Sequence, residues 1–235
     1  MIRQETLDNW NKETAKFTPE QIINFAFRNI DGPITMATSL SIEDQHLLYL
    51  IRKSGHDCSF FTLDTGRLPQ ETYDTIAATE NFFGIKIETF FPDKKEVEEL
   101  VNQHGVNCFY ESFDLRKACC HIRKRNPMDR ALEGKSAWFT GLRREQSITR
   151  ISIPVFDLNE STGIIKISPL ADMFENEVWS EIEKNNIPFN ILQKQGYRSL
   201  GCLPCTRPIS DDDDFRAGRW WWENPENKEC GIHKK

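Results

Sequence analysis

Short apolar runs alternate with amphipathic segments over the first two-thirds of the chain. A continuous apolar run is typical of a strand buried on both faces, and apolar residues spaced by three and four are typical of a helix. Thr18 and Pro19 supply the N-cap and the first position of the earliest predicted helix. The pattern predicts strands over 33–38, 58–63, 85–90, 137–140 and 164–168, and helices over 18–29, 42–53, 70–83, 94–103 and 175–185.

This alternation predicts right-handed βαβ units, and therefore an α/β fold with a parallel sheet. From about Gly196 onward the periodicity fades, and Gly, Pro, Cys, Asp and Trp dominate. We therefore expect a single α/β domain over residues 1–200 and an irregular C-terminal segment over residues 201–235 that lies on its surface. A chain of 235 residues is long enough to bury one good core.

Hydropathy excludes some classes of protein. No stretch approaches the length of a membrane span, and the first residues lack the apolar core of a secretory signal. We therefore expect a protein of the cytoplasm that has no membrane partner.

The charge is distributed unevenly. The chain has a net charge of −6, which argues against general binding of nucleic acid. Residues 116–150 nevertheless hold ten basic and three acidic residues, a net charge of +7. A local basic region on an acidic protein favours a small anionic ligand, although a solvated helix face has the same spacing.

Three polar segments follow predicted strands, where ligands bind in open parallel sheets. They are 39–44, 64–67 and 141–144. Ser39 and Ser41 at the start of a helix are suited to a phosphate, although Ser41 and Asp44 also match a capping box. Asp64 is placed to bond a ribose hydroxyl, although Asp followed by Thr-Gly is equally typical of a turn.

The cysteines indicate metal binding or thiol chemistry. There are seven, an odd number, and in a reducing compartment a disulfide framework is not expected. The Cys119-Cys120 pair and the Cys202-x-x-Cys205 pair form a set suited to an iron–sulfur cluster, with structural zinc as the alternative. Cys230 lies apart, near the end of the chain. Nearby basic groups favour its thiolate, although an incidental surface cysteine fits as well.

These segments match a family when taken together. The matching motifs are Ser39–Asp44, Leu63–Leu68, Cys119-Cys120 with Lys124, Arg143–Arg150, Cys202-Leu203-Pro204-Cys205, Arg216-x-x-Arg219-Trp220-Trp221-Trp222-Glu223 and Glu229–His233. From about residue 34 to the end, the chain resembles the assimilatory sulfonucleotide reductases, and within them the iron–sulfur adenylyl-sulfate (APS) reductases.

The resemblance implies a Rossmann-like parallel sheet of the adenine-nucleotide α-hydrolase type. It implies one 4Fe–4S cluster, bound by Cys119, Cys120, Cys202 and Cys205. It also implies that Cys230 is the catalytic nucleophile on a mobile tail, with Lys124 and His233 as further catalytic residues. The substrate-binding residues that it implies are Ser39, Ser41, Leu63, Thr65, Gly141, Arg144, Arg150, Arg216 and Arg219.

The implied activity is reduction of adenosine 5′-phosphosulfate to sulfite and AMP through an S-sulfocysteine intermediate, in sulfate assimilation and cysteine biosynthesis. Thioredoxin or glutaredoxin is the implied electron donor. The sequence is compatible with a homo-oligomer but does not give the oligomeric state.

Three other functions stay open. A reductase of the 3′-phosphorylated substrate, PAPS, is the nearest, although such enzymes typically lack the four paired cysteines. An ATP-dependent thiolation or adenylation enzyme would need a glycine-rich loop, which residues 39–44 lack. A cluster- or zinc-bearing RNA-binding module conflicts with the net charge of −6.

Overall fold

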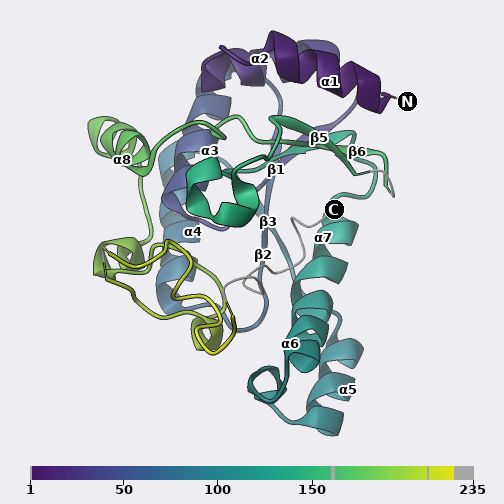
Figure 1. Ribbon diagram of the computed structural model, residues 1–235, viewed down its shortest axis with the longest axis vertical. Coiled ribbons are helices and arrows are strands. Elements are labelled where there is room, and N and C mark those ends of the chain that lie inside the picture. The colour runs from purple at the N-terminus through teal and green to yellow at the C-terminus, as the bar shows by residue number, and fades with distance from the viewer. Residues whose placement is uncertain (1, 160–161, 211, 225–235) are drawn as a thin grey trace.

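One mainly parallel sheet organises the protein. The computed structural model describes residues 2–159, 162–210 and 212–224. Its sheet has six strands in the order β3-β2-β1-β4-β6-β5, and β5 alone of these runs antiparallel to its neighbour (Figure 1). The strands are β1 (Ile34–Ala37), β2 (Ser59–Leu63), β3 (Ile87–Phe90), β4 (Ala137–Phe139), β5 (Phe156–Asn159) and β6 (Ile164–Ile167).

Helices follow the strands in alternation, as the sequence predicts. The described helices are α1 (Gln4–Glu13), α2 (Pro19–Asn29), α3 (Ile42–Ser54), α4 (Gln70–Phe83), α5 (Lys94–His104), α6 (Phe113–Cys120), α7 (Asn126–Ala131) and α8 (Glu175–Lys184). Helix α2 begins with a capping box between Thr18 and Gln21. The predicted α/β fold is confirmed, whereas α1, α6, α7 and β5 were not predicted.

A π-helical turn, His121–Arg125, joins α6 to α7, so the two helices form a nearly continuous rod beside the sheet (Figure 1). The turn carries Lys124. Such turns insert an extra residue into a helix and re-aim the side chains near it.

The main core lies where the central strands meet α2 and α3. Met36, Phe139 and Ile167 are fully buried there, in a cluster that also contains Leu47 and Ile51 of α3. A smaller, separate apolar cluster lies around Phe109, Trp220 and three of the paired cysteines. The C-terminal segment therefore packs on the second cluster, outside the main core.

The C-terminal segment has little regular structure, as the fading periodicity predicts. Residues 196–210 and 212–224 contain one short 3₁₀ turn, Leu203–Cys205, and one isolated bridge between Thr206 and Arg219. The division at residue 200 stays a prediction.

The outer edge of the sheet is covered by the N-terminal helix. The Asn11 side-chain amide donates to the backbone carbonyl of Phe156 at 2.8 Å, and its oxygen accepts from the Phe156 N–H at 2.9 Å. Asn11 thereby satisfies both backbone groups that edge strand β5 presents at this residue. No described helix is long and apolar enough to cross a membrane.

Candidate active site

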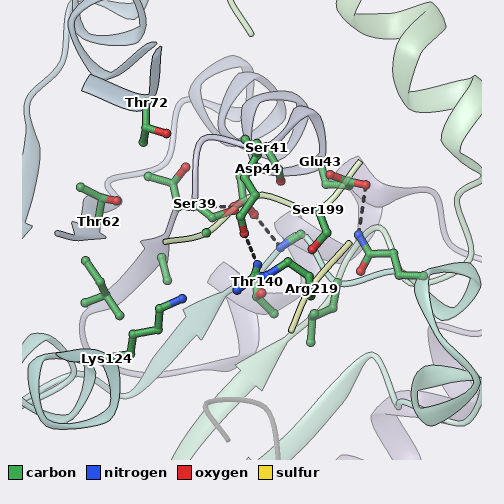
Figure 2. Close-up of a pocket in the computed structure, with 18 of the residues that line it drawn as sticks. Ser39, Ser41, Glu43, Asp44, Thr62, Thr72, Lys124, Thr140, Ser199 and Arg219 are labelled. Atoms are coloured by element: carbon green, nitrogen blue, oxygen red, sulfur yellow. Dashed lines mark hydrogen bonds between the residues drawn. The ribbon is translucent and has the colours of Figure 1, made fainter. Parts of the chain in front are cut away.

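A pocket opens at the carboxyl ends of β1, β2 and β4, where the sequence predicts a ligand site. It encloses about 1160 Å³ of space, part of it open to solvent. Figure 2 shows Ser39 and Ser41 on one side and Lys124 and Arg219 entering from other segments. The predicted substrate-binding or catalytic residues that line it are Ser39, Ser41, Leu63, Thr65, Lys124, Gly141, Arg150, Arg216 and Arg219.

Asp44 joins the turn after β1 to the end of β4. Its carboxylate accepts from the Ser39 N–H at 2.6 Å, from the Ser39 hydroxyl at 2.7 Å and from the Gly141 N–H at 3.1 Å. Burial raises the pKa of Asp44 to about 6, against the opposing hydrogen bonds from Ser39. The alternative capping box is not formed, because the Ser41 side chain makes no cap hydrogen bond.

Position 141 requires glycine, because the turn after β4 passes close to Glu43 and Asp44 at the start of α3. A Cβ atom at Gly141 would lie 2.5 Å from Oδ1 of Asp44 and 2.9 Å from Cβ of Glu43. Any side chain there would separate the two turns that form the floor of the pocket.

The turn after β2 divides its roles between neighbouring residues. Asp64 is 4% exposed, accepts from the Gly66 N–H at 2.7 Å and from the Tyr73 hydroxyl at 2.9 Å, and does not line the pocket. Asp64 therefore has the turn role that the sequence left open. Thr65 and Leu63 line the pocket instead.

The basic region 116–150 is not a solvated helix face. Arg116, Arg123, Arg143 and Arg150 are all less than 9% exposed. Arg150 lines the pocket and donates to the Gln146 side-chain oxygen at 2.6 Å. Gln146 in turn donates to the buried Glu43 carboxylate at 3.0 Å.

Arg144 does not line the pocket. Its guanidinium donates to the Ile153 carbonyl at 2.9 Å and pairs with Asp172. Its predicted role in substrate binding stays a prediction, but the structure does not bring Arg144 to the residues named above.

The four paired cysteines converge on a second, smaller cavity. Cys119 and Cys120 end α6, Cys202 is the N-cap of the 3₁₀ turn Leu203–Cys205, and Cys205 ends that turn. The residues that line this cavity are Arg67, Phe109, Arg116, Cys119, Cys120, Arg123, Lys124, Cys202 and Cys205. Lys124 lines both cavities, so it joins the cysteine site to the pocket.

Burial and nearby cations act in opposite directions on the pKa of the thiols. Burial raises the pKa of the Cys119 thiol, and it raises the pKa of the Cys205 thiol to about 12. Arg123 opposes the rise at Cys119, and Arg219 opposes it at Cys205. Thiols in this state keep their protons until a metal group displaces them.

The four thiols are not arranged as the ligands of a single metal ion. Within the described parts of the chain, no three His, Cys, Asp or Glu side chains are grouped in that way. The four thiols that share a cavity nevertheless form a soft donor set, and the basic side chains around it suit a negatively charged thiolate-bound group. The residues present therefore fit such a group.

Two predicted catalytic residues, Cys230 and His233, lie outside the described residues. Two buried residues that support the pocket, Glu43 and Gln146, were not singled out as site residues. Both fall inside motifs noted above, and the available signal was their polar character beside a strand end.

The strand order and the position of the pocket define an α/β fold with a mainly parallel sheet and a pocket at the carboxyl ends of its central strands. A solved FMN adenylyltransferase of Candida glabrata shares this fold, with a TM-score of 0.60 at 14% identity over 91% of this chain and 71% of that chain. At that identity the likeness concerns the fold alone.

Residues 33–208 match the model of the phosphoadenosine phosphosulfate reductase domain. The chain is 45% identical over 233 residues to the adenosine 5′-phosphosulfate reductase of Allochromatium vinosum, covering 99% of this chain and 91% of that one. It is 46% identical over 200 residues to that of Burkholderia cepacia, covering 85% and 80%. The chain therefore belongs to the phosphoadenosine phosphosulfate reductase family, which confirms the resemblance.

A solved structure agrees with this assignment. The phosphoadenylyl-sulfate (PAPS) reductase of Candida auris, crystallised as a phosphate complex, has a TM-score of 0.76 at 27% identity. The match covers 88% of this chain and 98% of that chain.

Proposed function

We propose that this protein reduces adenosine 5′-phosphosulfate to sulfite and AMP, as a step of sulfate assimilation that leads to cysteine biosynthesis in the cytoplasm. The observation that carries the proposal is the pocket at the strand ends, where hydroxyls from one turn meet basic side chains from three other segments. The names of relatives at 45% and 46% identity support the choice of substrate.

The pocket offers different chemistry to each part of such a substrate. Leu63, Thr65 and Gly141 would line the adenosine, and Ser39 and Ser41 would face the phosphate. The phosphosulfate would lie among four basic residues, Lys124, Arg150, Arg216 and Arg219, with His233 added from the tail. Positive charge held in a partly enclosed site stabilises charge that develops on the leaving phosphate.

Cys230 is the proposed nucleophile. Its thiolate attacks the sulfur of the phosphosulfate, the bond from sulfur to the bridging oxygen breaks, and AMP leaves with the electron pair of that bond. Cys230 then carries an S-sulfonate. A thioredoxin or glutaredoxin thiolate attacks the Cys230 Sγ and releases sulfite, and a second thiol of the donor resolves the mixed disulfide. The donor dithiol supplies both electrons and ends as a disulfide.

The cysteine site would hold a 4Fe–4S cluster through Cys119, Cys120, Cys202 and Cys205. When bound, the cluster would act through its charge and would hold the two cysteine pairs together. Lys124 lines both cavities and would therefore place its ammonium group between the cysteine site and the sulfate oxygens. Lys124→Ala should lower the rate while leaving iron content unchanged. If iron is lost as well, Lys124 has a structural role instead.

The deciding experiment is anaerobic sulfite release with thioredoxin from APS and PAPS in parallel. We expect kcat/KM for APS to exceed that for PAPS by at least about 100-fold, because discrimination is a difference in transition-state binding. Sulfite from neither substrate, in protein that contains iron and sulfide, would overturn the proposal.

Reduction of PAPS is the second candidate. The Candida auris structure is named a PAPS reductase, and its fold covers 88% of this chain. Equal rates with the two substrates would mean that the pocket also accommodates a 3′-phosphate.

A further inference from the structure

A buried ion pair attaches the last described part of the C-terminal segment to the helix that carries the first cysteine pair. The Glu223 carboxylate accepts from Nε of Arg116 at 2.9 Å and from Nη2 at 2.6 Å. The side chains are 1% and 7% exposed. This two-point contact fixes direction as well as distance, because the guanidinium and the carboxylate are both planar.

Arg116 also contacts two aromatic rings. Its guanidinium carbon lies 4.9 Å from the ring centre of Phe113 and 4.6 Å from that of Trp220. Arg116 also donates a hydrogen bond to the Cys120 sulfur. One side chain therefore contacts a predicted cluster ligand, an aromatic residue of the C-terminal segment and the acid that follows it.

The residues before Glu223 have further attachments near this point. The Trp220 N–H donates to the Cys205 carbonyl at 3.2 Å, and the Glu223 N–H donates to the Trp220 carbonyl at 2.8 Å. Toward the N-terminus, the next side-chain contacts with the body are those of Trp222 and Trp221 with Tyr110, at 4.5 and 6.3 Å between ring centres. Glu223 is thus the described residue nearest in sequence to Cys230 for which the structure gives a side-chain anchor on the body of the protein.

Six residues lie between Glu223 and Cys230 in sequence. Seven residue steps span at most about 25 Å even when fully extended, so the position of Glu223 limits which part of the pocket Cys230 can reach. Loss of the ion pair would leave the contacts of Trp222 and Trp221 with Tyr110 as the last described side-chain attachment before Cys230. The sequence distance to Cys230 would then grow by only one residue, so the expected effect comes from the loss of direction and not from length.

We propose that Arg116 and Glu223 are positioning residues, whose ion pair fixes the point from which the chain runs on to Cys230. The inference rests on the proposed function, in which Cys230 is the nucleophile. The ion pair has a second effect, on charge. Arg116 neutralises the carboxylate of Glu223, which belongs to the same segment as Arg216 and Arg219. Those two arginines line the pocket proposed for the anionic substrate.

The test uses the full-length, iron-loaded protein and the variant Glu223→Gln, which keeps the shape of the side chain and removes its charge. Glu223→Gln touches none of the cysteines in the contacts described above. The matched control is Glu183→Gln, which removes the charge of an exposed acid 3.7 Å from Lys194. Amide hydrogen exchange, iron content, kcat and KM for APS are measured on each protein.

In Glu223→Gln we expect amide exchange over residues 216–224 to accelerate by at least about tenfold, while β1, β2 and β4 exchange as in the wild type. We expect kcat to fall by about two- to tenfold with KM within about twofold of the wild type, because the pocket still binds substrate while the tail is misplaced. Iron content and Glu183→Gln should match the wild type. Glu223→Asp, which keeps the charge, should recover part of the loss.

Wild-type exchange and kcat in Glu223→Gln would overturn the proposal. So would a KM that rises as much as kcat falls, or a loss of iron, because either outcome makes the ion pair a general structural contact. If the wild type forms no sulfite from APS or PAPS, the proposed function fails. The exchange data then still decide whether the pair anchors the segment.

Discussion

The sheet and the C-terminal segment supply side chains to the same pocket, but they are held in different ways. The turns of the sheet continue from backbone ladders: the Thr38 N–H donates to Phe61 at 2.8 Å, and the Thr140 N–H donates to Ile167 at 2.9 Å. The C-terminal segment is held mainly by side chains. Trp220 is 1% exposed and contacts the guanidinium groups of three arginines, Arg116, Arg216 and Arg219.

The backbone conformation of Trp220 shows that side-chain contacts hold the C-terminal segment. Its φ angle is +41°, in the left-handed region that a bulky residue enters at a cost of about 1–2 kcal/mol. Burial of an indole among cations offsets that cost. The sheet thus provides a rigid frame for binding, whereas the segment depends on a few side-chain contacts. If the proposed function holds, binding belongs mainly to the first region and reaction to the second.

The strongest test of this division is Cys230→Ser. Sulfite formation should fall by about 10⁴-fold or more, since the proposed nucleophile is lost, while APS should bind as to the wild type. Anaerobic assay and calorimetric titration with APS measure the two properties separately. Cys58→Ser, at the residue before β2, is the control and should keep its activity. Near-wild-type turnover in Cys230→Ser would exclude Cys230 as the nucleophile.

The next prediction compares two buried cysteines of the smaller apolar cluster, Cys202 and Cys108. Cys202→Ser should lower metal affinity by more than about 100-fold, because it removes a proposed ligand. Cys108→Ser should keep its iron, because Cys108 does not line the cysteine cavity. Iron and sulfide determination on purified protein distinguishes the two. Equal iron loss in the two variants would show that packing around the cysteine site, and not the identity of its ligands, decides whether iron is bound.

Two arginines that follow β4, Arg150 and Arg144, test which guanidinium groups contribute to substrate binding. Arg150→Ala should lower kcat/KM for APS by about 1000-fold, or ~4 kcal/mol, since a cation on the developing charge is removed. Arg144→Ala should cost less than about tenfold, because Arg144 pairs with a mostly exposed acid outside the pocket. Steady-state kinetics measures both, and an equal loss would favour direct contact of Arg144 with substrate.

The smallest effect concerns pH and the turn after β1. The pKa of Asp44 lies at about 6 in the folded protein against 3.8 for the free side chain, so the folded state binds more protons between those values. Stability should therefore decrease by at most about 3 kcal/mol as pH rises from about 4 through 6. Urea unfolding over that range should show the decrease in the wild type and not in Asp44→Asn. Parallel pH profiles would contradict the assignment.

The sequence predicts the regular part of this molecule well, for a physical reason. Predicted strands 33–38 and 58–63 contain β1 and β2, because strands buried on both faces must be continuously apolar. Strand β5 was missed, since only its first two residues are buried and it runs for just four residues. Helix α1 was missed as well, because Leu7 is its only buried residue.

The candidate site divides in the same way. The turns that follow the strands were found because their position depends on the strands alone. The support of Arg150 by Gln146 and Glu43 was not, since Glu43 and Gln146 are 103 residues apart and no local pattern links them. Arg144 and Arg150 lie on two consecutive 3₁₀ turns, where residue spacing does not reveal which guanidinium faces the pocket.

Asn11 blocks a position at which a strand of another molecule could pair with the edge of the sheet. Its amide occupies both backbone groups of Phe156, as a neighbouring strand would, at the open edge of the sheet. The family match begins only at residue 33, so a shorter chain would keep every pocket residue described above. Such a chain would also present β5 as a template for strands of other molecules. The first helix, which contributes no residue to the lining of the pocket, therefore blocks strand pairing at Phe156.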